Sequence, residues 1–78
     1  MAKKTRKQAL IDWFKFNGYE NITGHSRTTK YIVFQGNNTK KYYIGKNGAL
    51  RIGKTVSSSL SVTDSKRYNE IVADGMLK

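Results

Sequence analysis

The chain has 78 residues, which is enough for one small domain and too few for two hydrophobic cores. Fifteen Lys and Arg residues against five Asp and Glu residues give a formal charge of +10, and the sequence contains no cysteine. These numbers exclude a disulfide framework and a cysteine-based metal site. Because no apolar run approaches the roughly 20 residues of a membrane-spanning helix, we expect a soluble protein of the cytoplasm.

The positive charge is unevenly distributed along the chain. Between Glu20 and Asp64 lie 43 residues without an acidic side chain, and this stretch carries seven Lys and Arg residues. A field of one sign attracts polyanions, and such binding weakens as salt rises because counterions are released. The distribution therefore favours a nucleic acid or an acidic protein surface as the partner.

The N-terminal region predicts a basic tail over residues 1–5 and a helix over about residues 6–17. Thr5 and Gln8 have the spacing of a capping box, in which the threonine hydroxyl accepts from a first-turn amide and the glutamine reaches back to the cap. Apolar residues at helical spacing follow, and an Asn-Gly pair is a typical helix end.

A polar segment over residues 21–29 predicts a connecting loop before a strand at residues 30–35. The apolar run inside this strand does not alternate with polar residues, so the pattern leaves open whether both faces are covered or one is a contact surface. The turn residues after it predict a second strand from Lys40 onward.

Residues 40–55 predict a two-stranded hairpin. A two-residue turn at its tip would place apolar Ile44 opposite charged Arg51. A three-residue loop with Gly48 in the left-handed conformation instead pairs Ile44 with Leu50. We therefore predict the three-residue loop.

This register divides the hairpin side chains between two faces. Tyr42 and Ile52 join the apolar face, while Tyr43 lies opposite Arg51 on the other. Aromatic rings can stack on bases while cations bind phosphates, so the second face suits a nucleic acid. The alternative is that its rings lie beneath one of the helices.

The remaining chain predicts one further helix. Residues 56–62 alternate between apolar and polar side chains and form either a fourth strand or an extended loop. Thr63 and Asp64 are both suitable N-caps for a helix that ends at Gly75. We expect a small α+β fold over residues 6–78: an N-terminal helix, a three-stranded antiparallel sheet with a possible fourth strand, and a C-terminal helix.

Residues 48–55 match G-x-x-x-x-G-K-[ST], the pattern of a phosphate-binding loop. That motif needs a loop that leads into a helix, whereas the residues between these glycines predict a strand. His25 stands alone in a polar loop, and the five acidic residues are scattered. We therefore expect no enzymatic activity, no metal site and no cofactor.

Both predicted helices carry a basic pair in the first turn, Arg6-Lys7 and Lys66-Arg67. Positive charge there opposes the helix dipole at a cost of about 0.3–1 kcal/mol. The unpaired backbone N–H groups at a helix start, together with these cations, would form a phosphate-binding site. The bound phosphate would then offset the unfavourable interaction with the dipole. The alternative is that solvent screens the exposed charges and the arrangement is incidental.

Two resemblances bear on the class of protein. The order helix, three strands, helix resembles the double-stranded RNA-binding domain. The sequence GKNGALRIGKT followed by SSSLSVTD looks like short basic proteins of phages and mobile elements in Gram-positive bacteria. The second resemblance implies an origin in a phage or mobile element, which is compatible with a phage-encoded regulator.

We predict a small, non-enzymatic nucleic-acid-binding protein, with DNA favoured over RNA. If sequence is read at all, the hairpin would read it in a groove. The other cations would contact backbone phosphates, and phosphate contacts alone would give non-specific binding. The alternative is a phage-type inhibitor or adaptor that binds an acidic surface of a host protein. The residues predicted to contact nucleic acid are Lys3, Lys4, Arg6, Lys7, Lys40, Lys41, Tyr43, Lys46, Arg51, Lys54, Lys66 and Arg67.

Overall fold

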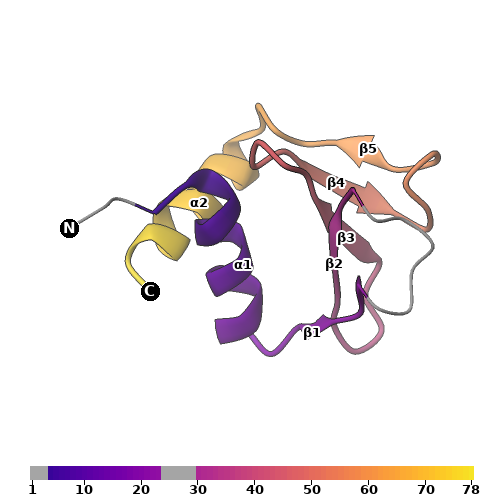
Figure 1. The fold of residues 1–78 in the computed structure, drawn as a ribbon, viewed down its shortest axis with the longest axis horizontal. Coiled ribbons are helices and arrows are strands. Elements are labelled where there is room, and N and C mark those ends of the chain that lie inside the picture. Colours follow the sequence, from indigo (N-terminus) through magenta and orange to yellow (C-terminus); the bar gives the residue numbers. More distant parts are fainter. Residues whose placement is uncertain (1–3, 24–29) are drawn as a thin grey trace.

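The computed structural model describes residues 4–23 and 30–78. Two helices, α1 (Arg6–Phe16) and α2 (Lys66–Met76), lie together on one side of an antiparallel sheet (Figure 1). The α+β class and both helices are confirmed.

The sheet has five strands in the order β1-β2-β3-β4-β5, each antiparallel to its neighbours. The strands are β1 (Glu20–Asn21), β2 (Ile32–Gln35), β3 (Lys41–Ile44), β4 (Leu50–Gly53) and β5 (Leu60–Ser61). The prediction of three strands with a possible fourth was too low. The two edge strands have two residues each, too few for an alternating pattern to mark them, and pairing with β2 and β4 defines them instead.

The hairpin of β3 and β4 has the predicted three-residue loop. Ile44 pairs with Leu50, and Gly48 adopts a φ of +82°. The Gly45 N–H donates to the Ala49 carbonyl at 2.8 Å and closes the loop. A slip of one residue would have moved every β4 side chain to the other face of the sheet, which explains why the apolar pattern fixes the register.

The core lies between the helices and the sheet and is rich in aromatic rings. Phe14 of α1 stacks on Phe34 of β2 with ring centroids 5.5 Å apart, and meets Tyr19 edge to face at 5.0 Å. Leu10 and Tyr68 are buried in the same cluster. Full burial of one large apolar side chain contributes about 1.5–3 kcal/mol, so this cluster lets a short chain fold without disulfides.

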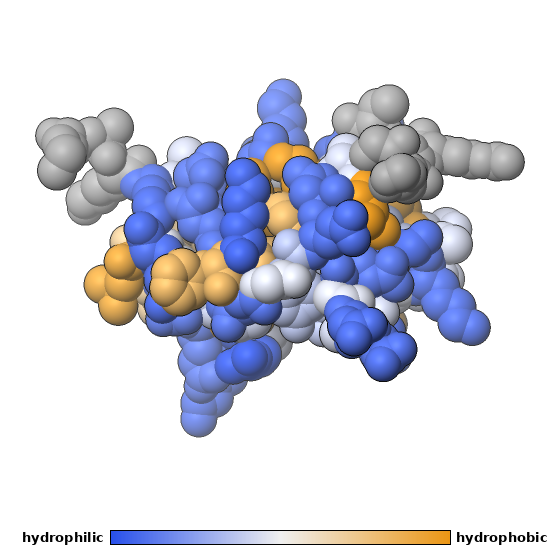
Figure 2. Space-filling model, turned by 90° about the horizontal axis from the view of Figure 1, so that it is seen from below, coloured by the Kyte–Doolittle hydropathy of each residue, from blue (hydrophilic) through white to orange (hydrophobic). Residues whose placement is uncertain are grey.

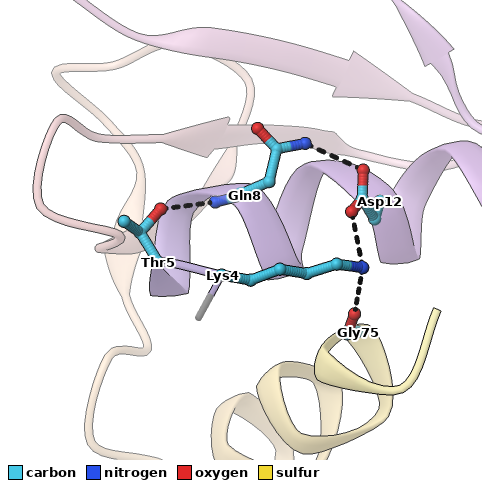
Figure 3. A network of polar contacts seen from close by, with 5 residues as sticks. All are labelled: Lys4, Thr5, Gln8, Asp12 and Gly75. Atoms are coloured by element: carbon cyan, nitrogen blue, oxygen red, sulfur yellow. Dashed lines mark hydrogen bonds and ion pairs between the residues drawn. The ribbon is translucent and has the colours of Figure 1, made fainter. Parts of the chain in front are cut away.

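A polar network joins the start of α1 to α2 (Figure 3). The Thr5 hydroxyl accepts from the Gln8 N–H at 3.1 Å, as the capping box predicted. The reciprocal half of that box is wrong, because Gln8 Nε2 donates to Asp12 Oδ1 at 2.9 Å instead. Lys4 Nζ lies 2.7 Å from Asp12 Oδ2 and donates to the Gly75 carbonyl at 3.1 Å. The bond from Lys4, and then that from Gln8, lowers the pKa of Asp12 below its usual 3.8.

Helix α2 differs from its prediction at both ends. Its N-cap is Ser65, whose hydroxyl accepts from the Tyr68 N–H at 3.0 Å, one residue beyond the predicted caps. The helix also continues past Gly75, which was predicted to end it. A Cβ at Gly75 would lie 2.1 Å from the Ala9 carbonyl oxygen of α1. This glycine therefore serves close contact between the two helix backbones.

Candidate nucleic-acid interface

Alternate residues of β2, β3 and β4 point away from the helices, and we call the surface they form the outer face of the sheet. Val33, Tyr43 and Arg51 lie side by side on it, one from each strand. The intervening residues, such as Phe34 and Ile44, enter the core. The predicted placement of Tyr43 and Arg51 on the face opposite the core is confirmed.

Tyr43 is nevertheless covered rather than exposed. Its side chain is 2% exposed beside fully buried Val33, and its hydroxyl donates to the Lys54 carbonyl at 2.8 Å. Burial raises the pKa of the Tyr43 hydroxyl above its usual value. The sequence predicted an exposed ring ready to contact a partner, so this expectation is corrected. Tyr43 is thus a buried packing residue of the outer face, and its hydroxyl binds the backbone at Lys54.

Arg51 is held in place by Ser59. Its Nε donates to the Ser59 hydroxyl at 3.0 Å and its Nη2 donates to the Ser59 carbonyl at 3.3 Å. The chain can approach this closely because β4 has a glycine there, and a Cβ at Gly53 would lie 2.6 Å from the Ser59 Cα. A guanidinium has five N–H donors, so these two bonds leave others for a ligand.

A hollow of about 640 Å³ lies on the outer face beside the hairpin tip, and we call it the tip hollow. Among the described residues, four cationic side chains, one aromatic ring and no acidic side chain contribute to its wall. The lining residues are Lys7, Lys30, Tyr31, Gly45, Lys46, Asn47, Ala49, Arg51 and Ser61.

Lys7 reaches the tip hollow because the hairpin loop packs against the first turn of α1. A Cβ at Gly48 would lie 2.6 Å from the Arg6 Cβ and 2.9 Å from the Lys7 backbone nitrogen. The Tyr68 hydroxyl of α2 donates to the Gly48 carbonyl. The loop is thus fastened to both helices.

A second hollow, of about 450 Å³, lies at the opposite end of the outer face, and we call it the turn hollow. Its lining residues are Gln35, Asn38, Thr39, Lys40, Lys41 and Lys54. The two hollows lie at opposite ends of β3, with Lys41 at one and Gly45 at the other. Four residues of strand span about 13 Å.

The structure brings six of the predicted contact residues into these two hollows. Three lie at the tip hollow and three at the turn hollow: Lys7, Lys46 and Arg51, then Lys40, Lys41 and Lys54. The sequence could group the hairpin residues, but only the fold adds Lys7 to them.

The other predicted residues lie elsewhere. Lys4 is engaged with α1 and α2, and Arg67 lies over the Trp13 ring, 5.7 Å from its centroid. Arg6 and Lys66 are exposed in the first turns of their helices and line neither hollow. Lys3 was also predicted, and it falls outside the residues that the structure describes.

Two side chains suited to bind a nucleic acid line the tip hollow without having been predicted, Lys30 and Tyr31. A Cβ at Gly45 would lie 3.5 Å from the Tyr31 Cε1, so the tyrosine ring packs beside the residue that follows β3. It meets Tyr43 edge to face, with ring centroids 6.3 Å apart. The missing signal was the register of β2 against β3, because the unbroken apolar run of β2 does not reveal which side chains share a face.

Four of the five acidic residues lie in or beside the helices, whereas Glu20 lies in β1 and pairs with Gln35 of the turn hollow. Asp12 lies in α1, while Glu70 and Asp74 lie in α2. Glu70 lies 3.6 Å from the Arg67 guanidinium, and Asp74 lies 3.8 Å from the Lys78 ammonium. The sequence from β2 to β5 contains cations and no acid, so Glu20 at the β1 edge is the acidic side chain that opposes the positive charge of the sheet.

Comparison of the chain with protein-family models, curated proteins and solved structures gave no match. Within residues 4–23 and 30–78, no group of three His, Cys, Asp or Glu side chains is placed to hold a metal ion. Neither α1 nor α2 is long and apolar enough to cross a bilayer. The stretch that matches a phosphate-binding loop contains strand β4, as predicted.

Proposed function

We propose that this chain is a small, non-enzymatic nucleic-acid-binding protein whose interface is the outer face of the sheet. One observation carries the proposal: two hollows lined by cations lie on the same face, about 13 Å apart along a strand. Phosphates of one nucleic acid can occupy both, and each neutralised phosphate releases counterions that favour binding. We propose DNA as the preferred partner, with RNA second.

The interface suits phosphate contacts better than base-edge readout. Contacts to phosphates fix position and carry no sequence information, whereas specificity needs groups that enter a groove. Because Gly48 at the hairpin tip is packed against α1 and bonded to Tyr68, the hairpin is poorly placed for such entry. We therefore propose binding with weak sequence preference.

A salt titration of binding tests the proposal. The logarithm of the affinity for duplex DNA falls by about 0.9 per neutralised phosphate for each tenfold rise in salt. Six contacts would give a slope of about −5 and weaken binding roughly 1,000-fold between 50 and 200 mM salt. Fluorescence anisotropy with labelled DNA and RNA of one sequence measures this slope. Binding that ignores salt, or no binding at 50 mM salt, would sink the proposal.

A second candidate is an inhibitor or adaptor that binds a host protein, and an exposed apolar group favours it. Phe16, Met76 and Leu77 are 70%, 40% and 86% exposed. Lys78 Nζ lies 4.1 Å from the Phe16 ring centroid, so the C-terminal residues approach the end of α1. Figure 2 shows hydrophobic surface at this helical end of the molecule, among hydrophilic side chains.

The two candidates use different ends of the molecule, so one variant separates them. Phe16→Ser would abolish stoichiometric capture of a host protein from nuclease-treated lysate if the helical end is the interface. The same variant leaves DNA affinity unchanged if the outer face is the interface. Failure of the wild-type chain to capture any protein counts against the second candidate.

A further inference from the structure

We propose that the tip hollow binds one unpaired nucleotide, with the base on Tyr31 and the phosphate on the surrounding cations. This inference rests on the proposed function and adds to it a preference for single-stranded over duplex nucleic acid. It assigns different roles to the two hollows, because only the tip hollow has an aromatic ring in its wall.

Tyr31 has the properties of a stacking platform. Its ring packs beside Gly45, and edge-to-face contact with Tyr43 fixes its position further. The side chain is partly exposed and lines the tip hollow. A ring supported on one side and open on another can accept a base of any identity, because every base has a π-face.

The phosphate side of the tip hollow is also organised in advance. Ser59 orients the Arg51 guanidinium through two bonds and leaves other N–H donors available. Lys46 is exposed on the loop and Lys7 comes from α1, so cations approach the hollow from three elements. Arginine is well suited to phosphate because its planar group can donate two parallel hydrogen bonds.

The volume and the wall of the tip hollow fit a single nucleotide. Pockets for small ligands typically have volumes of about 300–1,000 Å³, and the 640 Å³ hollow lies within this range. Its lining combines Tyr31 with cations and with the hydroxyl of Ser61. In a nucleotide, the base matches the aromatic ring, the sugar matches the hydroxyl and the phosphate matches the cations.

An unpaired strand fits this arrangement better than a duplex. Bases inside a duplex are stacked on both faces, so their π-faces are closed to Tyr31, whereas unpaired bases can turn outward onto an aromatic ring. The turn hollow offers Lys40, Lys41 and Lys54 without an aromatic residue. We assign to it a second phosphate of the same strand.

The test compares a labelled oligothymidine with a duplex at the same salt concentration. Tyr31→Leu should weaken single-strand binding roughly 5- to 150-fold, which corresponds to about 1–3 kcal/mol for a stacked base. The same variant should leave duplex binding within about twofold, and Tyr31→Phe should keep the affinity for both because the ring remains.

A matched control removes an exposed ring from the helical layer. Phe16→Leu makes the same aromatic-to-aliphatic change at a side chain that is 70% exposed. Nine helical residues separate it from Lys7, a distance of about 14 Å. This variant should change neither affinity.

The position of the ligand is measured directly by NMR on the wild-type protein. A thymidine dinucleotide should shift the amide signals of Gly45 and Ala49, beside Tyr31, and inorganic phosphate should shift them much less. Equal shifts with both ligands would mean that the hollow takes only a phosphate and would overturn the inference. If Tyr31→Leu does not fold, this measurement decides alone.

Failure of the inference and failure of the proposed function are distinguishable. If Tyr31→Leu weakens both substrates equally, or neither, the inference is overturned while salt-dependent binding by the wild type still supports the function. If the wild type binds neither single strands nor duplex at 50 mM salt, the proposed function fails and takes the inference with it.

Discussion

The helical layer and the outer face of the sheet use charge in opposite ways. In and next to the helices, Asp12, Glu70 and Asp74 each form an ion pair with a nearby lysine or arginine. On the outer face, Arg51 is held by a neutral partner, Ser59, which orients the guanidinium without cancelling its charge. Charge thus contributes to packing on one side of the molecule and remains available to a polyanion on the other.

The two regions also differ in how closely they pack. The helix backbones touch at Gly75 and Ala9, above a core of interlocking rings. The outer face buries Val33 and Tyr43 and has a hollow at each end of β3. The helical layer is therefore closely packed, whereas the outer face of the sheet has space at both ends of β3.

The largest expected effect comes from neutralising the turn hollow. The triple variant Lys40→Gln, Lys41→Gln, Lys54→Gln should weaken DNA binding on the order of 100-fold at 0.1 M salt, because three phosphate contacts are lost. The salt slope should also fall by about 2.7. Anisotropy titrations at several salt concentrations measure both quantities.

Its control removes the same charge from the helical layer. DNA affinity should fall less than about tenfold in this control, since only long-range attraction is reduced. The control variant is Lys15→Gln, Lys66→Gln, Arg67→Gln. Equal losses of DNA affinity in the two triple variants would contradict the proposal that the outer face, rather than the helical layer, binds DNA. They would restore Lys66 and Arg67 as contact residues.

The next largest effect concerns the contact between the helices. Helix propensity alone predicts that Gly75→Ala stabilises the protein by about 1 kcal/mol. The added Cβ would lie 2.1 Å from the Ala9 carbonyl oxygen, so we expect a loss of about 1–3 kcal/mol from overpacking instead. Urea unfolding gives the sign directly. A more stable variant would show that the helices separate at little cost.

The hydrogen bond from Tyr68 to the hairpin loop should contribute somewhat less to the free energy of unfolding than the contact at Gly75. Tyr68→Phe leaves the carbonyl of buried Gly48 without its donor, which costs about 1–2 kcal/mol of unfolding free energy. Tyr31→Phe is the matched control, because it removes a phenol hydroxyl at a partly exposed position and should change stability by less than about 0.5 kcal/mol. Similar losses from both variants would argue against a special role for the Tyr68 bond.

The smallest effect is the pH dependence contributed by Asp12. Its pKa is lowered in the folded state, so its stabilisation is present above the usual value of 3.8 and is lost as pH falls below it. At pH 7 the free energy of unfolding of the wild type should exceed that of Asp12→Asn by less than about 1 kcal/mol. Urea unfolding at a series of pH values should show the two unfolding free energies converging as the pH falls toward 2. A constant gap would exclude a contribution from this carboxylate.

Local sequence patterns determined the elements with regular spacing. Alternation of apolar residues at Ile44 and Leu50 selected the register of the hairpin because a slip would expose the apolar side chains. Thr5 was recognisable as a cap because its hydroxyl bonds to an amide only three residues away. The basic side chains of β3, β4 and their loops could be grouped for the same reason, since neighbours in a hairpin are close in sequence.

Contacts between distant segments decided the rest. The sequence could not reveal that Tyr43 is covered, that Lys7 joins the hairpin, or that Tyr31 packs beside Gly45, because each depends on how separate elements pack. Gly75 reads as a helix end by propensity, yet it lies inside α2 and permits contact with α1. Spacing along the chain thus established a basic, two-faced hairpin, and only tertiary packing placed its cations around hollows.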